Sequence, residues 1–198
     1  MSFVNTIDEL GDDIVFGSIV DGTITDFKDD ALNSVASYTF RSCDKLSSIV
    51  LPSATSIGGN AFQHCSSLTS VNLPSATSIG KSAFTGCYNL ASVDLPKATS
   101  IENAVFSGCT KLASVNFPVV ISIGSSAFYQ CSLTTLILRS ETMCALANTN
   151  AFSSTPIASG TGYIYVPEAL VEEYKVATNW STYANQFRAI EDYPDICG

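Results

Sequence analysis

The sequence predicts a repeat protein: a right-handed solenoid with a parallel β-sheet, mainly β with short 3₁₀ turns, and helical caps at both ends. Two columns of residues at a constant step of 22 indicate this fold. They are five cysteines and the five phenylalanines that stand three positions earlier: Cys43, Cys65, Cys87, Cys109, Cys131, and Phe40, Phe62, Phe84, Phe106, Phe128. Such a step is typical of one small unit stacked on its own copies. Because a coil cannot bury its apolar face alone, about six coils must stack and both ends need covers.

Each coil is expected to begin with a short strand that ends at a proline. Apolar and polar residues alternate between Leu68 and Leu73, which is the period of a strand with one buried face. Proline has no N–H for a ladder and therefore ends each strand. The equivalent positions are Leu46, Leu68, Leu90, Leu112 and Leu133 for the leucines, and Pro52, Pro74, Pro96 and Pro118 for the prolines.

A second inward-facing position follows in each coil, and glycine comes after it at positions 58, 80 and 124. No run is both long and 3.6-periodic, so the outer side is expected to hold short strands or 3₁₀ turns. The inward residues are Ile57, Ile79, Ile101 and Ile123.

The repeated pattern is L-x-x-[VIL]-x-L-P-x-[AV]-x-x-I-[GE]-x-x-[AV]-F-x-x-C, over about residues 31–152. It resembles the BspA-like leucine-rich repeat family of bacteria and some protists. The resemblance implies a leucine-rich repeat solenoid and a recognition or adhesion role. The commoner leucine-rich pattern has Asn or Cys three places after the last strand leucine. This chain has apolar residues there, so the inside of that bend is expected to be apolar: Ala54, Ala76, Ala98 and Val120.

The flanks predict caps within a single domain, with an N-terminal cap over 1–30, repeats over 31–161 and a C-terminal cap over 162–198. Thr6 or Asp8 can cap a helix over Leu10 to Ile19, before a short strand near 23–27. Residues 162–190 also resemble the terminal unit of many family members. There Pro167 suits the first helical position, and an apolar stripe and an aromatic plug follow: Leu170, Val171, Tyr174, Ala177, and Trp180, Tyr183, Phe187. Phe152 falls 24 residues after Phe128, which makes that copy irregular.

Charge and hydropathy exclude several classes of partner. The net charge is −9, with eight acids and one base in residues 1–30, against four acids and six bases in residues 31–152. No clustered basic face is present, which argues against nucleic acid. No apolar run approaches the roughly 20 residues that cross a bilayer. The start of the chain has no leader pattern, so we expect a cytoplasmic protein, although many relatives of the family are cell-surface or secreted proteins.

The cysteine column has three interpretations: buried free thiols, disulfides or a metal site. Free thiols are favoured, because stacked side chains point in parallel and no C-x₂-C pair seeds a zinc site. His64 adjoins Cys65, but neighbouring residues in extended chain point opposite ways, which disfavours a catalytic pair. The acids of residues 1–30 lack the spacing of a calcium loop and are expected to form a solvated surface. A catalytic cleft would require Glu141, Cys144 and an acid of a cap to converge in the irregular stretch 141–162. We expect no metal and no cofactor.

Binding is expected on the outward side of the stacked strands, which repeat proteins use as a concave recognition surface. Two rows of residues recur there. One row is Ser48, Ser70, Ser92, Ser114 and Thr135, and the other is Val50, Asn72, Asp94, Asn116 and Ile137. The proposed contacts are their polar members, and neither row contains the Trp, Tyr or Arg typical of interface hot spots. A second candidate surface lies beside the cysteines: Arg41, His64, Tyr88 and Tyr129.

The sequence therefore predicts a non-enzymatic recognition or adhesion module that binds a protein, or alternatively a glycan, through a lateral face. A structural or host-contact component of a prophage or virion tail is the alternative, because the short leaderless form also resembles products of prophage regions in gut bacteria. The partner's identity and the oligomeric state stay open, with a monomer favoured. Fold alone does not fix function.

Overall fold

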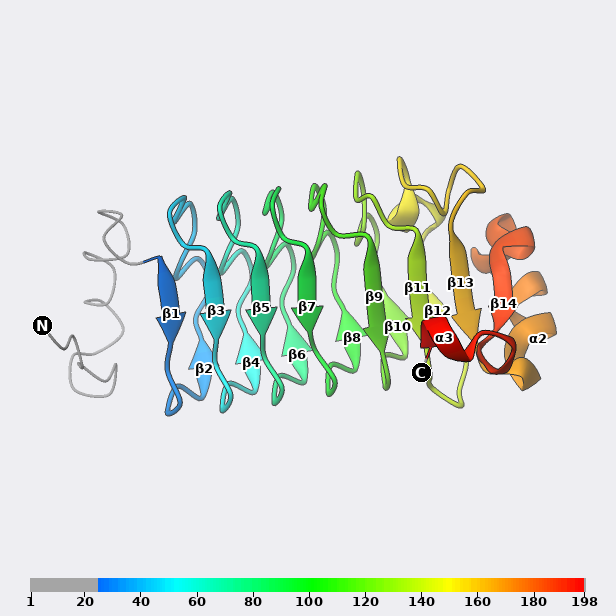
Figure 1. Cartoon of the computed structure of the whole chain (residues 1–198), viewed down its shortest axis with the longest axis horizontal. Coiled ribbons are helices and arrows are strands. Elements are labelled where there is room, and N and C mark those ends of the chain that lie inside the picture. Colours follow the sequence, from blue (N-terminus) through cyan, green and yellow to red (C-terminus); the bar gives the residue numbers. More distant parts are fainter. Residues whose placement is uncertain (1–24, 198) are drawn as a thin grey trace, which may run out of the picture.

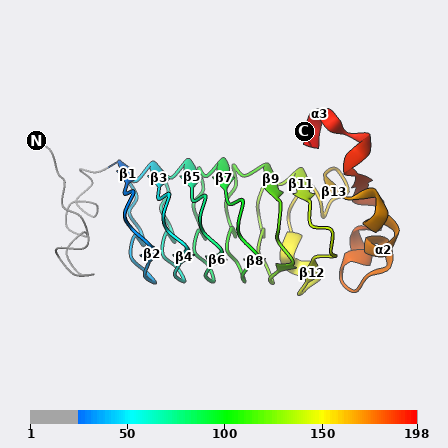
Figure 2. The ribbon, with the colours of Figure 1, turned by 90° about the horizontal axis from the view of Figure 1, so that it is seen from below.

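Short strands of successive coils pair in parallel and form a solenoid (Figure 1). The computed structural model describes residues 25–197. The helix expected over 10–19 lies outside these residues, as does most of the expected N-terminal cap. The predicted parallel solenoid, mainly β, is confirmed. Figure 2 shows that the strands follow a nearly straight axis, so the stack does not form the pronounced concave surface that we expected.

One side of the solenoid consists of two four-stranded parallel sheets. In the three-residue strands of the first sheet the central side chain points into the core and the flanking ones point out, as the alternation in the sequence predicts. The first sheet contains β1 (Asp26–Lys28), β3 (Ser48–Val50), β5 (Ser70–Asn72) and β7 (Ser92–Asp94). The second contains β9 (Ser114–Phe117), β11 (Thr135–Leu138), β13 (Tyr163–Val166) and β14 (Phe187–Ala189). We call the outward side of these eight strands the strand face.

A second side is a six-stranded parallel sheet of two-residue strands. Each strand buries its second residue, which in four of them is the isoleucine expected to point inward. The strands are β2 (Ser34–Val35), β4 (Ser56–Ile57), β6 (Ser78–Ile79), β8 (Ser100–Ile101), β10 (Ser122–Ile123) and β12 (Ala145–Leu146). The bend between the two sides is apolar, as expected, because Ala54, Ala76, Ala98 and Val120 are all buried.

The third side, which we call the turn side, contains hydrogen-bonded turns. Its backbone still forms a ladder between coils: the Phe62 N–H donates to the Ala83 carbonyl at 2.8 Å, and Phe84 N–H to Val105 at 2.9 Å. The chain bends twice per coil by adopting positive φ, five positions and one position before each repeat cysteine. Glycine, which tolerates this region best, is present only at Gly86 and Gly108. The other residues are Tyr38, Ser42, Asn60, His64, Ser82, Ala104, Ser126 and Gln130.

The core between the three sides is a continuous column of stacked phenylalanine rings. Successive centroids from Phe40 to Phe128 lie 5.0 to 5.7 Å apart with nearly parallel planes. Phe152 extends the column in spite of its irregular spacing in the sequence. Its ring centroid lies 5.6 Å from that of Phe128, and the two ring planes differ by 3°. It lies in the short 3₁₀ helix η2 (Thr149–Phe152), so the two additional residues leave the stacking undisturbed.

The C-terminal cap closes the last coil with η3 (Glu168–Leu170), α2 (Val171–Val176) and η4 (Trp180–Gln186). The helical segment starts one residue after Pro167, because Pro167 has ψ of 139° and precedes the turn. The ring centroid of Trp180 lies 5.8 Å from that of Phe152, which confirms the predicted aromatic plug. The cap also satisfies backbone groups of the last coil: the Trp180 Nε1–H donates to the Cys144 carbonyl at 2.7 Å, and the Cys144 N–H donates to the Tyr174 hydroxyl at 2.7 Å.

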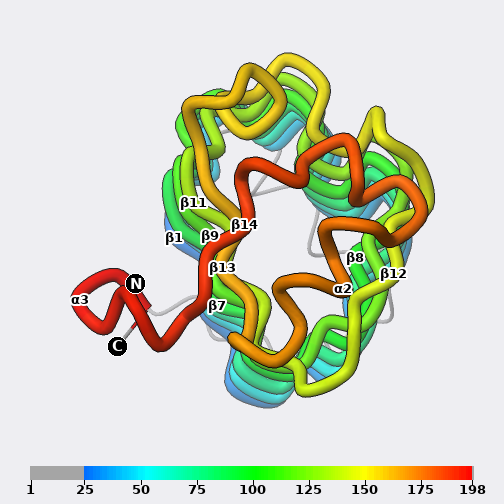
Figure 3. Tube along the Cα trace, turned by 90° about the vertical axis from the view of Figure 1, so that its right-hand side faces the viewer, coloured from blue at the N-terminus to red at the C-terminus, as the bar shows by residue number. Residues whose placement is uncertain are grey.

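Two short elements follow β14 at the end of the cap, η5 (Ile190–Asp192) and α3 (Pro194–Cys197). All three ribbon and tube views place α3 on the outer side of the strand face (Figures 1, 2 and 3). Within residues 25–197, no helix combines the length and the apolar character needed to span a bilayer.

The left-handed backbone of the turn side makes one substitution stabilising. Ala104 has φ of 57°, where a Cβ is unfavourable, so Ala104→Gly is expected to raise the free energy of unfolding by about 0.5–1 kcal/mol. Ala91→Gly is the control: Ala91 is exposed and outside the left-handed region, so glycine there should lower stability. Urea unfolding followed by circular dichroism measures both. A loss of stability in both variants would contradict the strain argument.

Candidate recognition surface

The strand register brings together the side chains that the sequence predicts as binding residues. Ser48, Ser70 and Ser92 are register partners across β3, β5 and β7, and Asn72 pairs with Asp94. Across β9 and β11, Ser114 pairs with Thr135 and Asn116 with Ile137. The eight predicted contacts therefore lie on one side of the molecule. The structure shows their placement, and their role in binding stays a prediction.

At the N-terminal end of the strand face, Asp26 accepts three hydroxyl hydrogen bonds. Ser48 donates at 2.5 Å, and Ser47 and Thr25 each donate at 2.9 Å. These bonds hold the pKa of Asp26 below its ordinary value, with Ser48 as the largest contribution. Ser48, a predicted contact residue, is therefore already bound to Asp26.

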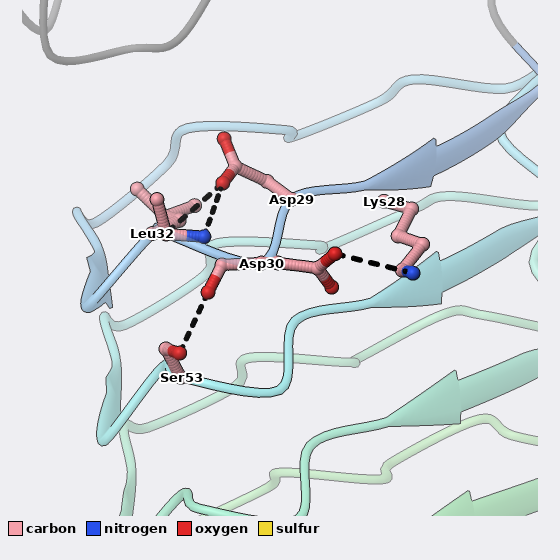
Figure 4. Close-up of polar contacts among 6 residues, drawn as sticks. Lys28, Asp29, Asp30, Leu32 and Ser53 are labelled. Atoms are coloured by element: carbon pink, nitrogen blue, oxygen red, sulfur yellow. Dashed lines mark hydrogen bonds and ion pairs between the residues drawn. The ribbon is translucent and has the colours of Figure 1, made fainter.

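The neighbouring acids have partners of their own (Figure 4). Asp29 Oδ1 accepts the backbone N–H groups of Ala31 at 2.8 Å and Leu32 at 3.0 Å, which shapes the turn after β1. Asp30 forms a solvent-exposed ion pair with Lys28 at 3.2 Å. Within residues 25–197, no group of three or more His, Cys, Asp or Glu side chains could hold a metal ion. The remaining acids of the predicted cap surface lie outside the described residues.

The middle of the strand face is polar and open. Asn72, Ser92, Asp94 and Ser114 are exposed. Their strands are fixed by the inward residues and not by these side chains: Val71 is buried in the repeat core and Val93 packs against it. Substitutions of these exposed side chains should therefore have little effect on the fold.

The C-terminal end of the strand face differs from the prediction. Both rows continue into the cap, because Tyr163 pairs with Thr135, Tyr165 with Ile137, and Arg188 with Tyr165. The two predicted rows themselves contain no tyrosine or arginine, but the register extends them to residues of both types. Ile137 was expected to be solvent-exposed but is buried beneath residues 190–197. Among the predicted contacts, Asn116 is engaged by the protein itself, since its Oδ1 accepts from Arg139 Nε at 3.0 Å.

The second candidate surface, on the turn side, is exposed as predicted. Tyr88 and Tyr129 are 50% and 37% exposed, and Arg41 and His64 are also exposed. The His64 imidazole lies against Gly86: a Cβ added at Gly86 would come within 2.4 Å of its Nδ1. His64 thus packs on the surface of the next coil, whereas the thiol of Cys65 points into the core.

The repeat cysteines form a buried ladder of S–H donors. Four of the five repeat thiols donate to the carbonyl of the phenylalanine in the preceding coil, 25 residues earlier, a bond that the sequence pattern did not predict. The four contacts are Cys65 to Phe40 at 2.9 Å, Cys87 to Phe62 at 3.1 Å, Cys109 to Phe84 at 3.2 Å and Cys131 to Phe106 at 3.0 Å. All seven cysteines are buried and free. The expected free buried thiols are confirmed.

Burial makes these thiols poor nucleophiles. It raises the pKa of Cys87 and of Cys131 to about 12, and that of Cys43 to about 11. In the irregular stretch 141–162, burial also raises the pKa of Cys144 to about 12, while Glu141 is exposed. The structure therefore does not bring Glu141 and Cys144 together as an activated pair.

Comparison with known proteins agrees with this geometry. Residues 33–158 match the family model for the BspA type leucine rich repeat region in six copies. A leucine rich cell surface protein from Faecalibacterium prausnitzii superposes with a TM-score of 0.55 and 23% identity, over 72% of this chain and 48% of that one. A Treponema pallidum leucine rich repeat protein superposes with a TM-score of 0.54 and 23% identity, over 83% of this chain and 85% of that one. A Bacteroides ovatus leucine-rich repeat protein superposes with a TM-score of 0.51 and 18% identity, over 85% of this chain and 54% of that one. These similarities show the fold. No curated protein matches.

This chain thus spans about half the length of the Faecalibacterium protein, and of the Bacteroides protein as well.

The buried thiols predict loss of stability at alkaline pH. A thiol with an ordinary pKa of 9.0 when unfolded and about 12 when folded, as at Cys87, binds its proton more tightly in the native state. Its stabilising contribution is present below pH 9 and is lost as the pH rises from 9 towards 12. Urea unfolding at pH 8, 9, 10 and 11 should show falling stability. The variant Cys87→Ala should start less stable and show a shallower decline, and an equal slope in both proteins would contradict this assignment.

Proposed function

The chain belongs to the BspA-type leucine-rich repeat family, and we propose that it is a recognition module that binds a protein through the strand face. Proteins of this repeat class interact through surfaces that their stacked units line. One observation carries the proposal: the register aligns exposed polar side chains across successive coils, and the fold does not use the central ones for packing.

The role is proposed to be non-enzymatic. The thiols are buried with raised pKa values, and His64 packs on the turn side away from the strand face. Recognition through a repeat surface requires no reactive centre, only a fixed arrangement of contacts. Asn72 and Asp94 supply such contacts at adjacent positions of β5 and β7.

The strand face is favoured over the turn side because it leads into a larger set of contact residues. Tyr163 and Arg188 lie at its C-terminal end, with the Arg188 guanidinium 4.4 Å from the Tyr163 ring centroid. Tyrosine and arginine are enriched in interface hot spots. A partner lying along the strands would therefore contact polar side chains in the middle and aromatic ones at the end.

A matched pair of charge reversals tests the surface. Asp94→Lys changes an exposed carboxylate on the strand face, and Glu102→Lys changes one that follows β8 on the six-stranded side. Both alter the net charge equally and should change stability by less than about 0.5 kcal/mol. Asp94→Lys is expected to reduce partner capture about tenfold, because a cation would replace an anion within the contact.

The measurement is quantitative mass spectrometry of proteins retained from a biotinylated surface-protein extract by each immobilised variant. Proteins lost with Asp94→Lys and kept with Glu102→Lys are partners of the strand face. If the retained proteins are instead lost with Glu102→Lys and kept with Asp94→Lys, the partner binds the six-stranded side and the proposal fails. If neither variant changes the retained set, the middle of the strand face makes no contact and the proposal also fails.

A further inference from the structure

Residues 190–197 cover an apolar patch on the strand face. The patch consists of Ile137 on β11 and Tyr165 on β13, which are only 4% and 3% exposed although both point away from the repeat core. Together with Cys197 they form a hydrophobic cluster separate from the repeat core, with Ile190 and Tyr193 packed against it. The cluster exists because the chain folds back over its own sheet after β14 (Figure 3).

The contacts in this cluster define what the patch recognises. The ring of Tyr193 meets the ring of Tyr165 edge to face, with centroids 5.3 Å apart and planes at 73°. Cys197, four residues later on the same short helical turn, is 2% exposed within the cluster that contains Ile137. The Arg139 guanidinium donates to the Cys197 carbonyl while its Nε holds Asn116.

Two arginines flank these contacts, Arg188 on β14 and Arg139 directly after β11. Both donate to backbone carbonyls, Arg139 to Cys197 and Arg188 to Asn185 and Phe187. The acids of residues 190–197 point to solvent: Glu191, Asp192 and Asp195 are exposed. The occupied patch is therefore an aromatic and aliphatic surface, with a guanidinium at its edge that binds a main-chain carbonyl.

The segment is held mainly by its side chains. Its backbone hydrogen bonds are local, from Tyr193 N–H to Ile190 and from Cys197 N–H to Tyr193. Its first turn is held by Glu191, which accepts the Glu168 N–H at 3.0 Å. Of the three buried side chains in this cluster only Cys197 belongs to the segment, and Ile190 and Tyr193 are partly buried. This burial is small compared with that of the repeat core, so the segment should open locally without unfolding of the coils.

We propose that the outer surface of β11 and β13 is a peptide-binding site, that residues 190–197 occupy it in cis, and that a partner segment displaces them. The partner segment has an aromatic residue followed four positions later by a small apolar residue. The aromatic ring packs on Tyr165, the small side chain contacts Ile137, and Arg139 binds a main-chain carbonyl. This site deepens the proposed function, since it lies on the same strand face.

Cys197 provides a direct test in the full chain. Its thiol is buried against Ile137 and Tyr165 and becomes accessible when the segment leaves the strands. Iodoacetamide labelling, located by mass spectrometry, should modify Cys197 before the cysteines of the repeat core. Tyr193→Ala should accelerate this labelling at least about tenfold, because the ring contact with Tyr165 is lost. Ile196→Ala is the matched control: Ile196 is 48% exposed in the same turn, so its rate should hardly change.

The probe is a synthetic peptide of residues 190–197 that carries Cys197→Ala. A tethered segment acts at an effective concentration in the millimolar range, so the free peptide should compete at a few millimolar. Labelling of Cys197 in the unaltered protein should then rise several-fold, and a peptide that also carries Tyr193→Ser should have no effect. The melting temperature of the repeats should stay constant.

Two results would overturn this proposal. In the first, the peptide leaves the rate unchanged although Tyr193→Ala accelerates it, which would make the segment a simple covering. In the second, protection of Cys197 grows with protein concentration, which would assign the patch to a second copy of the chain. The outcome is independent of Asp94→Lys: peptide competition with unchanged partner capture would keep the site and reject the middle of the strand face.

Discussion

Every feature of this protein depends on one constraint, which is that each coil returns to the same position after a fixed number of residues. The phenylalanine rings and the thiols impose it together. The ring centroids stack 5.0 to 5.7 Å apart along the axis, and four repeat thiols each bond to the phenylalanine carbonyl one coil earlier. Burial of one such ring contributes about 1.5–3 kcal/mol, whereas ordering one residue's backbone costs about 1–2 kcal/mol. Because a coil must order many residues, it is stable only when neighbouring coils bury its apolar side chains on both sides. The two end coils lack one neighbour and therefore need caps.

The C-terminal end shows how such a stack can be closed. A plug of apolar side chains would leave the backbone groups of the last coil without partners, and buried groups of that kind are costly. The cap instead supplies side chains with both an apolar body and a polar tip. Trp180 packs near Phe152 and donates to Cys144, while Asn179 donates to the Leu146 carbonyl at 2.7 Å. Asn179 is thus part of the closure.

The periodic part of the fold could be predicted from the sequence, and the parts without a period could not. Inward positions such as Ile57, Ala76 and Phe84 follow from the repeat alone, because equal steps place equivalent residues in one environment. The extension of the strand rows to Tyr163 and Tyr165 was missed, because no repeat aligns the cap with the coils. The burial of Ile137 was missed for a related reason: it depends on contacts with residues about sixty positions later, which no local pattern encodes.

The same constraint separates stability from recognition on this chain. Interior columns vary little, whereas the outward row changes from Val50 through Asn72 and Asp94 to Ile137 and Tyr165. Under the proposed function, the polar middle contributes orientation and the aromatic end contributes most of the binding free energy, since hot spots are dominated by such residues. Covering the aromatic end with residues 190–197 keeps an apolar patch from water. Under the peptide-site proposal a partner must outcompete an intramolecular segment, and simultaneous contacts with the polar rows would raise its affinity above that of the patch alone.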